Sequence, residues 1–367
     1  IAAEMAGVAA FDLAAILDHS GEVRIALEES GLFTPTLILV TIAAAAKSAQ
    51  VPLYFWLPRA MVAPTPVSAF LHSATMVKVG VYALGRVRPL FHGFEWMVLV
   101  ATLGIVTMTV GAVLAVLARD IKELLAYSTA SHLGLMVAAF GFRSHYGAEA
   151  GAFHLLNHAL FKAALFLVAG IIAHEAGTRH IDDLGGLRHD LPVTAIITAL
   201  AALSMAGIPP FNGFYSKEIL FEAAWETAQV SGGIAWLYPA AAVFASIFTV
   251  LYSLRFLWLF FGDRPEDLGP VHRAPIGLVA PPAVLAGAVA LVSVRPSLAI
   301  EAIVNDAARA TAVGTVDIHA GIPSHLSGPV LMSATALVVG FACFPFYTEI
   351  RDSLERLRAA TTRVHPT

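Results

Sequence analysis

The strongest constraint on the fold is an apolar, helix-length stretch that also carries ionisable side chains. Residues 47–80 read KSAQVPLYFWLPRAMVAPTPVSAFLHSATMVKVG and contain Lys47, His72 and Lys78. On insertion scales, a charged side chain near the middle of a bilayer costs about 2.5 to 3.5 kcal/mol. Membrane proteins that keep such residues usually use them for transport, so the stretch predicts a functional membrane segment.

Composition identifies the surroundings of the chain. Of its 367 residues, 58% are hydrophobic and 13% are charged, whereas an ordinary soluble domain has about 25% charged residues. Several stretches reach the roughly 20 apolar residues with which a helix crosses a bilayer core about 30 Å thick. We therefore predict an all-α polytopic membrane protein in contact with the lipid bilayer.

Charge, cysteine content and motifs exclude other classes. The net charge of −4 comes without a basic block, which argues against a nucleic-acid partner. The single cysteine, Cys343, cannot build a multi-cysteine metal or iron–sulfur site. No phosphate loop, HExxH or nucleophile elbow occurs, so we expect no catalytic residues and no bound cofactor. The chain begins at Ile1 without a signal-peptide pattern, and we interpret it as a fragment.

The first predicted span, residues 34–56, contains Lys47 with Pro52 five positions later. Proline removes a backbone donor and clashes with the preceding turn, so we expect the helix to kink or break beside the lysine. Residues 1–33 are interpreted as the tail of an upstream membrane segment and a loop.

The next predicted helix, residues 67–84, contains His72 and Lys78. In a regular helix these side chains are about 9 Å apart along the axis and about 120° apart around it, so they face different neighbours but can serve one polar path. The alternative is that Lys78 extends to the membrane interface and His72 caps a carbonyl group.

Two further helices are expected, at residues 96–117 and within residues 118–142. The first is a plain apolar span. The second begins with Asp120, Lys122 and Glu123. Asp120 is predicted to cap its N-terminus, and these charges are then interfacial. His132 is the candidate for an interior role.

A third polar segment lies in the predicted span at residues 148–173. His154, His158 and Lys162 follow one another at intervals of four, which places them on one helical stripe about 12 Å long, with Asn157 close to it. Histidine binds and releases protons near neutral pH, so the stripe predicts a proton relay. A zinc site is disfavoured because the lysine repels a cation and no neighbouring ligands complete it. A purely structural hydrogen-bonded stripe remains the other alternative.

A second break is predicted after the apolar residues 193–205, where the chain reads AGIPPFNGFYSKE. Glycine and proline cannot sustain a regular helix there, and broken membrane helices commonly mark ion sites. We expect the second half-helix to begin near Phe214, with Lys217 and Glu218 in its first turn. The alternative is an ordinary helix that begins at the interface.

The remaining chain is predicted to contain spans at residues 239–261, 276–294 and 326–347. Residues 295–324 are interpreted as an aqueous loop, and the mixed-charge tail after Thr348 as a helix at the membrane surface. The predicted organisation is a partial translocating module at residues 34–262, preceded by residues 1–33 and followed by residues 263–367.

The segments singled out above resemble a known family when taken together. The sequences KSAQVPLYFWLPRAMVAPTPVSAFLHSATMVKVGVY, DIKELLAYSTASHLGL, FHLLNHALFKAALFLVAGIIAHEAGTRHIDDLGGL and AGIPPFNGFYSKE resemble the antiporter-like membrane subunits of Mrp-type multisubunit cation/proton antiporters and of respiratory complex I. The resemblance covers most of residues 47–218. Within the family, TMVKVG and AHEAGTRHIDDLGG look like the A subunit of the Mrp antiporter.

The resemblance implies roles for individual residues and a fold. The implied fold is an antiporter-like helical bundle with two broken transmembrane helices. Lys47 corresponds to the lysine of the first broken helix and Lys217 to that of the second. The implied relay consists of Lys47, His72, Lys78, His154, His158, Lys162 and Lys217, with His132, Lys122, Glu218 and Asn157 as auxiliary residues. The family's glutamate partner of the first lysine, and most of a long C-terminal extension, are implied to lie outside this chain.

The resulting hypothesis is a proton-translocating subunit of a multisubunit Na⁺/proton antiporter, with K⁺ as the other candidate cation. Its implied partners are other membrane subunits of that complex, and its implied location is a bacterial cell membrane, crossed several times. The first alternative is a proton-pumping membrane subunit of an NADH-quinone oxidoreductase. The second is an anchoring subunit in which the polar stripes are inert.

Overall fold

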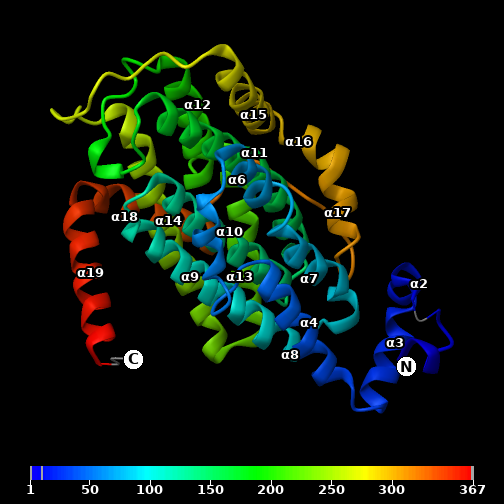
Figure 1. The fold of residues 1–367 in the computed structure, drawn as a ribbon. Helices are drawn as coiled ribbons and strands as arrows, with labels where there is room; N and C mark the ends of the chain where they lie inside the picture. Colours follow the sequence, from blue (N-terminus) through cyan, green and yellow to red (C-terminus); the bar gives the residue numbers. More distant parts are fainter. Residues whose placement is uncertain (1, 10, 365–367) are drawn as a thin grey trace.

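The computed structural model describes residues 2–9 and 11–364, with side chains as far as Ala360. Residues 1, 10 and 365–367, which belong to the first and last predicted segments, lie outside the described residues. Within the described residues the fold is helical (Figure 1), and the sole β-type pairing is an isolated antiparallel bridge between Asp120 and His180.

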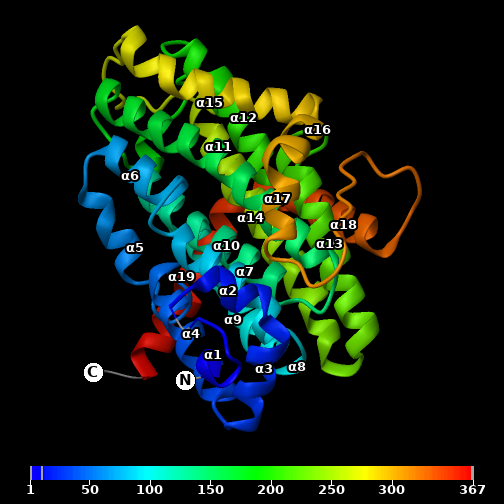
Figure 2. The ribbon, with the colours of Figure 1, turned by 90° about the vertical axis from the view of Figure 1, so that its right-hand side faces the viewer.

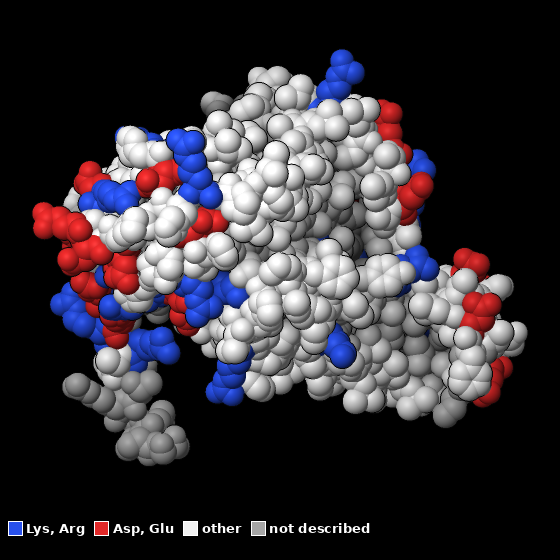
Figure 3. All heavy atoms as spheres, turned by 45° about the horizontal axis from the view of Figure 1, so that its top comes forward, with Lys and Arg blue, Asp and Glu red and all other residues white. Residues whose placement is uncertain are grey.

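Seven helices in the described residues are long and apolar enough to cross a membrane, or eight if a bent pair is one span. The bent pair joins α3 (Ser20–Glu29) and α4 (Phe33–Lys47) at 115°. Figure 3 shows a broad face of uncharged atoms, with most charged side chains near its edges. The predicted all-α polytopic membrane fold is confirmed. The seven spans are Thr65–Phe91, Phe94–Leu117, Ile121–Gly141, Tyr146–Glu175, Gly233–Phe261, Ile276–Val294 and Gly328–Ala360.

The centre of the bundle is α10 (Ile121–Gly141), of which nearly every residue is buried. It packs along α9 (Thr102–Leu117) and α11 (Tyr146–Glu175). Helix α11 also contacts four others, α6 (Thr65–Ser73), α12 (Pro192–Ala206), α13 (Asn212–Ser231) and α15 (Ile276–Val294). Figures 1 and 2 show α10 in the interior of the bundle from both viewpoints. Ser128 and His132, polar residues in the middle of α10, are therefore held away from lipid and water.

The first predicted break is confirmed. Helix α4 ends at Lys47, earlier than predicted, and residues 48–55 form turns before α5 (Trp56–Arg59) and η1 (Ala60–Val62). The turns are held from outside the segment, because the Val51 amide donates to Thr107 Oγ1 (3.0 Å) and Trp56 Nε1 to the Ala46 carbonyl (3.1 Å).

The predicted continuous helix at residues 67–84 is wrong. The structure has α6 (Thr65–Ser73) and α7 (Lys78–Phe91), separated by residues 74–77. Thr75 Oγ1 donates to the Phe70 carbonyl (3.1 Å), and a local side-chain bond of this kind competes with helix continuation. The regular-helix geometry expected for His72 and Lys78 therefore does not apply.

The second predicted break is also present. Helix α12 (Pro192–Ala206) ends at Gly207, whose φ of 79° is left-handed, and α13 (Asn212–Ser231) follows. Because α13 begins at Asn212, two residues before the predicted start, Lys217 and Glu218 lie in its second turn. The capping prediction for α10 is confirmed, since Asp120 accepts from the amides of Lys122 (2.7 Å) and Glu123 (3.2 Å).

The last third of the chain completes the bundle with α14 (Leu237–Phe261), α15 (Ile276–Val294) and α18 (Gly328–Cys343). The aqueous loop predicted for residues 295–324 is partly wrong, because α16 (Pro296–Ala299), η5 (Ile300–Val304) and α17 (Asn305–Arg309) lie within it. Ile300, Val304 and Ala308 repeat every four residues, and this buried apolar face belongs to segments that pack on α11.

The C-terminal helix α19 (Tyr347–Val364) lies at the edge of the bundle (Figure 1). Ion pairs hold it to the bundle. Arg351 Nη1 of α19 contacts Asp182 Oδ1 at 3.0 Å, and Arg255 Nη2, from the bundle, contacts the same oxygen at 3.2 Å. The predicted division at residues 34–262 stays a prediction. The remaining short elements are α1 (Ala2–Met5), α2 (Leu13–Asp18), α8 (Phe94–Trp96), η2 (Met97–Ala101), η3 (Ile181–Asp183), η4 (Gly233–Trp236) and η6 (Phe344–Phe346).

Candidate functional site

Three buried histidines meet at the centre of the bundle. His132 Nδ1 and His154 Nε2 are 2.9 Å apart, and their rings stack with centroids 5.1 Å apart. The His158 ring lies 5.5 Å from His132, and its nitrogens have no hydrogen-bond partner among the described residues. The structure thus joins the predicted stripe of α11 to the interior histidine of α10. Each ring has a donor and an acceptor nitrogen when neutral, which is the chemistry that proton transfer needs.

His132 and His154 belong to a longer hydrogen-bonded line. His154 Nδ1 is 2.9 Å from Ser216 Oγ, which also accepts from Asn157 Nδ2 at 3.1 Å. At the other end, His132 Nε2 is 3.1 Å from the Tyr252 hydroxyl. The line therefore crosses four helices, α14, α10, α11 and α13, without leaving the protein interior.

Two asparagines tie this line to the second helix break. Asn212 Nδ2 donates to Asn157 Oδ1 (2.9 Å), and Asn157 Nδ2 donates to the Asn212 carbonyl (2.9 Å). Ser204 Oγ on α12 donates to Asn212 Oδ1 (2.5 Å). The backbone N–H of Asn212, which has no partner within its own helix because it lies at the start of α13, donates to Ser293 Oγ (2.9 Å). Side chains from α11, α12 and α15 thus satisfy the polar groups that the break exposes.

Lys162 lies on the same face of α11 and is completely buried. Its Nζ donates to Ser128 Oγ on α10 (2.5 Å) and contacts Met205 Sδ on α12 (3.3 Å). None of the ion pairs among the described residues involves it. Because the lysine contacts a hydroxyl and a thioether and no carboxylate, it is suited to release and take up a proton, whereas a lysine in a structural ion pair is held in its charged form.

Lys217 is held at the second helix break. Its Nζ donates to the Ala206 carbonyl (3.0 Å) at the carboxyl end of α12, where the helix dipole favours a cation. The site depends on Gly207, because a Cβ there would lie 2.6 Å from Lys217 Cδ. The left-handed backbone of Gly207 and the absence of its side chain therefore both position the ammonium group.

Replacement of Gly207 by alanine is expected to reduce transport by the full complex about ten-fold, because small displacements of a reacting group are costly. Gly177→Ala is the matched control. Gly177 follows the C-terminal end of α11 and has a similar φ of 70°, but a Cβ there meets nothing within 4 Å. Transport rates of both variants, normalised to assembled complex, separate displacement of Lys217 from backbone strain. Equal losses in the two would contradict this role of Gly207.

The other predicted residues are distributed around this centre. Lys78 is 5% exposed and donates to the Leu155 carbonyl (2.7 Å), beside His154, so it does not extend to the interface. His72 stacks on Phe166 with centroids 5.7 Å apart and caps no carbonyl. Lys122 is buried and donates to the Ala63 carbonyl (2.8 Å). Lys47, by contrast, is exposed at the end of α4 and is not joined to the line.

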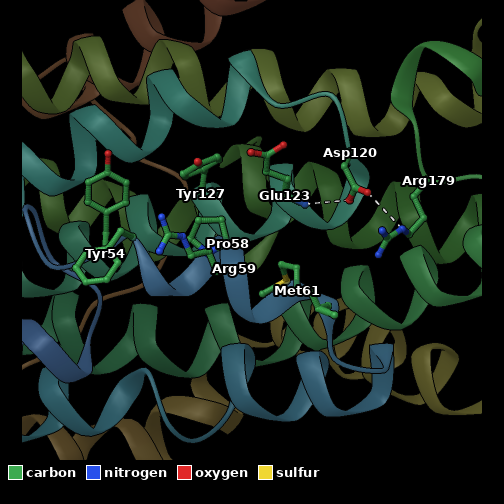
Figure 4. Close-up of a pocket in the computed structure, with 10 residues that line it drawn as sticks. Tyr54, Pro58, Arg59, Met61, Asp120, Glu123, Tyr127 and Arg179 are labelled. Atoms are coloured by element: carbon green, nitrogen blue, oxygen red, sulfur yellow. Dashed lines mark hydrogen bonds and ion pairs between the residues drawn. The ribbon is translucent and has the colours of Figure 1, made fainter. Parts of the chain in front are cut away.

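Open pockets lie at the two ends of α10. One, of about 470 Å³, is lined by Asp120 and Glu123 at the N-terminus of the helix. Figure 4 shows Asp120 paired with Arg179 on one side of it, and Arg59 and Tyr127 on the other. The second, of about 340 Å³, includes Phe142 at the opposite end. Ser128 and His132 lie between the two pockets.

Sequence reasoning missed five residues of the site. In the described part of the chain, no group of three or more His, Cys, Asp or Glu side chains could hold a metal ion. The histidines instead contact hydroxyl and amide groups. The only sequence signal for these partners is a polar residue inside an apolar helix, close to a predicted titratable one. The missed residues are Ser128, Ser204, Asn212, Ser216 and Tyr252.

Broken helices and buried lysine and histidine side chains inside an apolar bundle are typical of membrane proteins that move ions. The chain belongs to the family described as NADH:quinone oxidoreductase/Mrp antiporter, transmembrane, which matches residues 7–249. The family predicted from the motifs is therefore confirmed.

The relatives support this assignment. The A/B subunit of a probable K(+)/H(+) antiporter of Rhizobium meliloti (strain 1021) is 43% identical over 92% of this chain and 34% of its own length. The A subunit of a Na(+)/H(+) antiporter of Bacillus subtilis (strain 168) is 40% identical over 84% of this chain and 42% of its own length. The chain therefore spans well under half the length of these relatives.

Two solved structures share the fold. The Mrp complex from Dietzia sp. DQ12-45-1b matches with a TM-score of 0.77 and 35% identity, over 91% of this chain and 38% of the matched chain. An archaeal respiratory membrane complex, the membrane-bound sulfane sulfur reductase, matches with a TM-score of 0.69 and 31% identity, over 80% of this chain and 49% of the matched chain. Both matched chains are parts of larger complexes, and the second is named as a membrane complex.

Proposed function

We propose that this chain is the translocating part of a subunit of a multisubunit cation/proton antiporter in a bacterial cell membrane. The observation that carries the proposal is the continuous buried line from Tyr252 through His132, His154 and Ser216 to Asn157. The imidazole and hydroxyl groups of this line can each take and release a proton in one hydrogen-bonded chain, so they are suited to relay protons through a membrane, and Asn157 anchors its end.

In this proposal, protons move along the line in both directions between the broken helices. His132, His154 and His158 exchange protons by alternating between their two ring nitrogens. Lys162, held by Ser128, and Lys217, held at the end of α12, are the stations on either side. Lys78 contributes its charge next to His154. His72 is proposed as the step between this centre and Lys47, although no hydrogen bond among the described residues joins His72 to either of them.

The cation is proposed to be Na⁺, with K⁺ as the other candidate, because the relatives are named for one or the other. The lysines of the line repel a metal cation. The cation therefore crosses elsewhere in the hetero-oligomer and is coupled to the proton line through other membrane subunits. These partners are proposed from the multisubunit Mrp complex that this chain resembles.

A second candidate is a proton-pumping membrane subunit of an NADH-quinone oxidoreductase. Two observations favour it: the family description includes that enzyme, and the fold matches a subunit of an archaeal respiratory membrane complex. In that setting the same line would move protons, but a redox reaction in other subunits would drive it.

The two candidates differ in the driving force. We expect a pulse of Na⁺ or K⁺, without NADH, to change the internal pH of everted vesicles that contain the complete assembly, and an uncoupler to abolish the change. Lys47→Ala is expected to lose this response with assembly unchanged. A pH change that requires NADH and ignores the cation would support the oxidoreductase instead. Activity retained in Lys47→Ala would remove that lysine from the path.

A further inference from the structure

Helix α13 carries a graded line of carboxyl groups that the proposed relay does not use. Glu218, Glu222 and Glu226 follow one another at intervals of four and so lie on one face of the helix. Glu218 is 5% exposed, Glu222 is half-buried, and the Glu226 side chain is 33% exposed. The line therefore leads from the turn that holds Lys217 towards water.

The deep end of this line has an unused acceptor. Ser333 Oγ on α18 donates to Glu218 Oε2, whereas Glu218 Oε1 is buried and has no hydrogen-bond partner among the described residues. Carboxylates one turn apart repel each other. In the described residues, neither Glu218 nor Glu222 forms an ion pair with a lysine or arginine. Neighbouring carboxylates without a basic partner can accept a proton and pass it on.

A small cavity is lined by both Lys217 and Ser333, the residue whose hydroxyl donates to Glu218. It has about 10 Å³ of space, and its polar lining consists of Lys217, Ser246 and Ser333. Ser246 Oγ is buried and has no hydrogen-bond partner in the described residues. A cavity of roughly 10 to 15 Å³ with two to four polar partners holds one water molecule. It cannot hold a hydrated Na⁺, and the Lys217 ammonium group repels a bare one.

The exposed end of the line reaches an open pocket. Glu226 accepts from Ser144 Oγ and lies 3.2 Å from His145 Nδ1. All three residues line the pocket of about 340 Å³ at the C-terminal end of α10. Glu149 of α11 is close enough to Glu222 to act on it electrostatically, and so are His145 and His325. The carboxyl groups therefore follow one another at one-turn intervals from Glu218 to this pocket.

We propose that Glu218, Glu222 and Glu226, with one water bound by Lys217, Ser246 and Ser333, form the path by which protons pass between Lys217 and the pocket at Glu226. The proposal rests on the proposed function, because it supplies the aqueous connection of the Lys217 end of the relay.

The outward step balances as a chain of proton transfers. The Lys217 ammonium gives a proton to the water and becomes the neutral amine. The water gives a proton to Ser333 Oγ while the Ser333 hydroxyl proton passes to the Glu218 carboxylate. The resulting carboxylic acid passes its proton to Glu222, then to Glu226 and to water in the pocket. The inward step is the reverse.

The test uses the complete antiporter complex in everted vesicles, with cation-driven pH change as the readout and native gel analysis for assembly. Glu218→Gln keeps the shape of the side chain but cannot take a proton, so transport is expected to fall about ten-fold or more. Glu218→Asp is expected to keep a larger share of the rate. Glu301→Gln, at an exposed glutamate on η5, is the matched control and is expected to behave as wild type.

Ser246→Ala provides a second measurement that leaves every carboxyl group in place. It removes one ligand of the water, and we expect a several-fold loss of rate. Wild-type rates in both Glu218→Gln and Ser246→Ala, from a complex that does transport, would overturn the path while leaving the proposed function intact. No cation response in the wild type would overturn the proposed function instead. A higher Na⁺ requirement in Glu218→Gln with an unchanged maximal rate would identify a cation site and also overturn the path.

Discussion

Lys162→Arg is expected to abolish cation-driven proton movement in the full complex, with a loss of about a hundred-fold or more. Lys162 is fully buried, and its Nζ is bound by Ser128 Oγ and Met205 Sδ. Arginine preserves the positive charge but does not release its proton in a protein. If Lys162 carries protons, a side chain that keeps its proton cannot support proton transfer, even though it preserves the charge. The pH change in everted vesicles, normalised to assembled complex, measures the loss.

Lys162→Met completes this test, because methionine has a similar length and no charge. Loss of activity in both variants indicates proton transfer. Retention in Lys162→Arg alone would show that only the charge matters, and retention in both would make the residue structural. Ser128→Ala is the accompanying control for packing. It removes one hydrogen bond to the Lys162 ammonium group, which costs about 1.5 to 3 kcal/mol, but it leaves the proton-releasing amine in place, so a smaller loss is expected.

Gly134→Ala is expected to have the largest effect on folding, with a cost on the order of 3 kcal/mol. Helices α9 and α10 touch backbone to backbone here, because a Cβ on Gly134 would lie 2.4 Å from the Met108 nitrogen. A Cβ on Gly104, on the facing helix, would lie 2.2 Å from the Ala138 nitrogen. Backbone cannot rotate away as a side chain can, so the two helices would have to separate. Small residues commonly allow such close approach in membranes.

The measurement for this prediction is the temperature at which the purified protein loses its monodisperse form in detergent. Gly277→Ala, within α15, is the matched control, because it is also helical and its Cβ would meet nothing within 4 Å. We expect Gly277→Ala to equal or slightly exceed wild type, since alanine is the better helix former. Similar melting of the two variants would contradict the close contact of α9 and α10.

The breaks in the helices could be predicted because their causes are local. Pro52 after Lys47, and the run from Gly207 to Gly213, interrupt a helix by covalent geometry alone. The interruption at residues 74–77 contains no proline or glycine and was missed. It involves a hydroxyl bond from Thr75 to Phe70, and competition between such a bond and the helix is decided by packing.

The membership of the site was only partly predictable for the same reason. His154, His158 and Lys162 share one helix, so periodicity places them together. His132, Ser216 and Tyr252 come from three other helices, and no spacing relates them to the stripe. Lys47 shows the opposite case, because the sequence places it in an apolar span but the fold leaves it exposed at a helix end.

The sequence by itself determined the membrane class, the family and the chemistry of the interior. All five lysines are in the predicted set, Lys47, Lys78, Lys122, Lys162 and Lys217, whereas arginine is the only basic side chain besides histidine in the rest of the chain. Composition and helical periodicity are properties of neighbours in the chain, so they can be recognised without a fold. Only the tertiary structure decided which of these groups meet, because hydrogen bonds of about 3 Å depend on helix packing. The join between His132 and His154, the Gly207 recess for Lys217 and the carboxyl line of α13 all arise at that level.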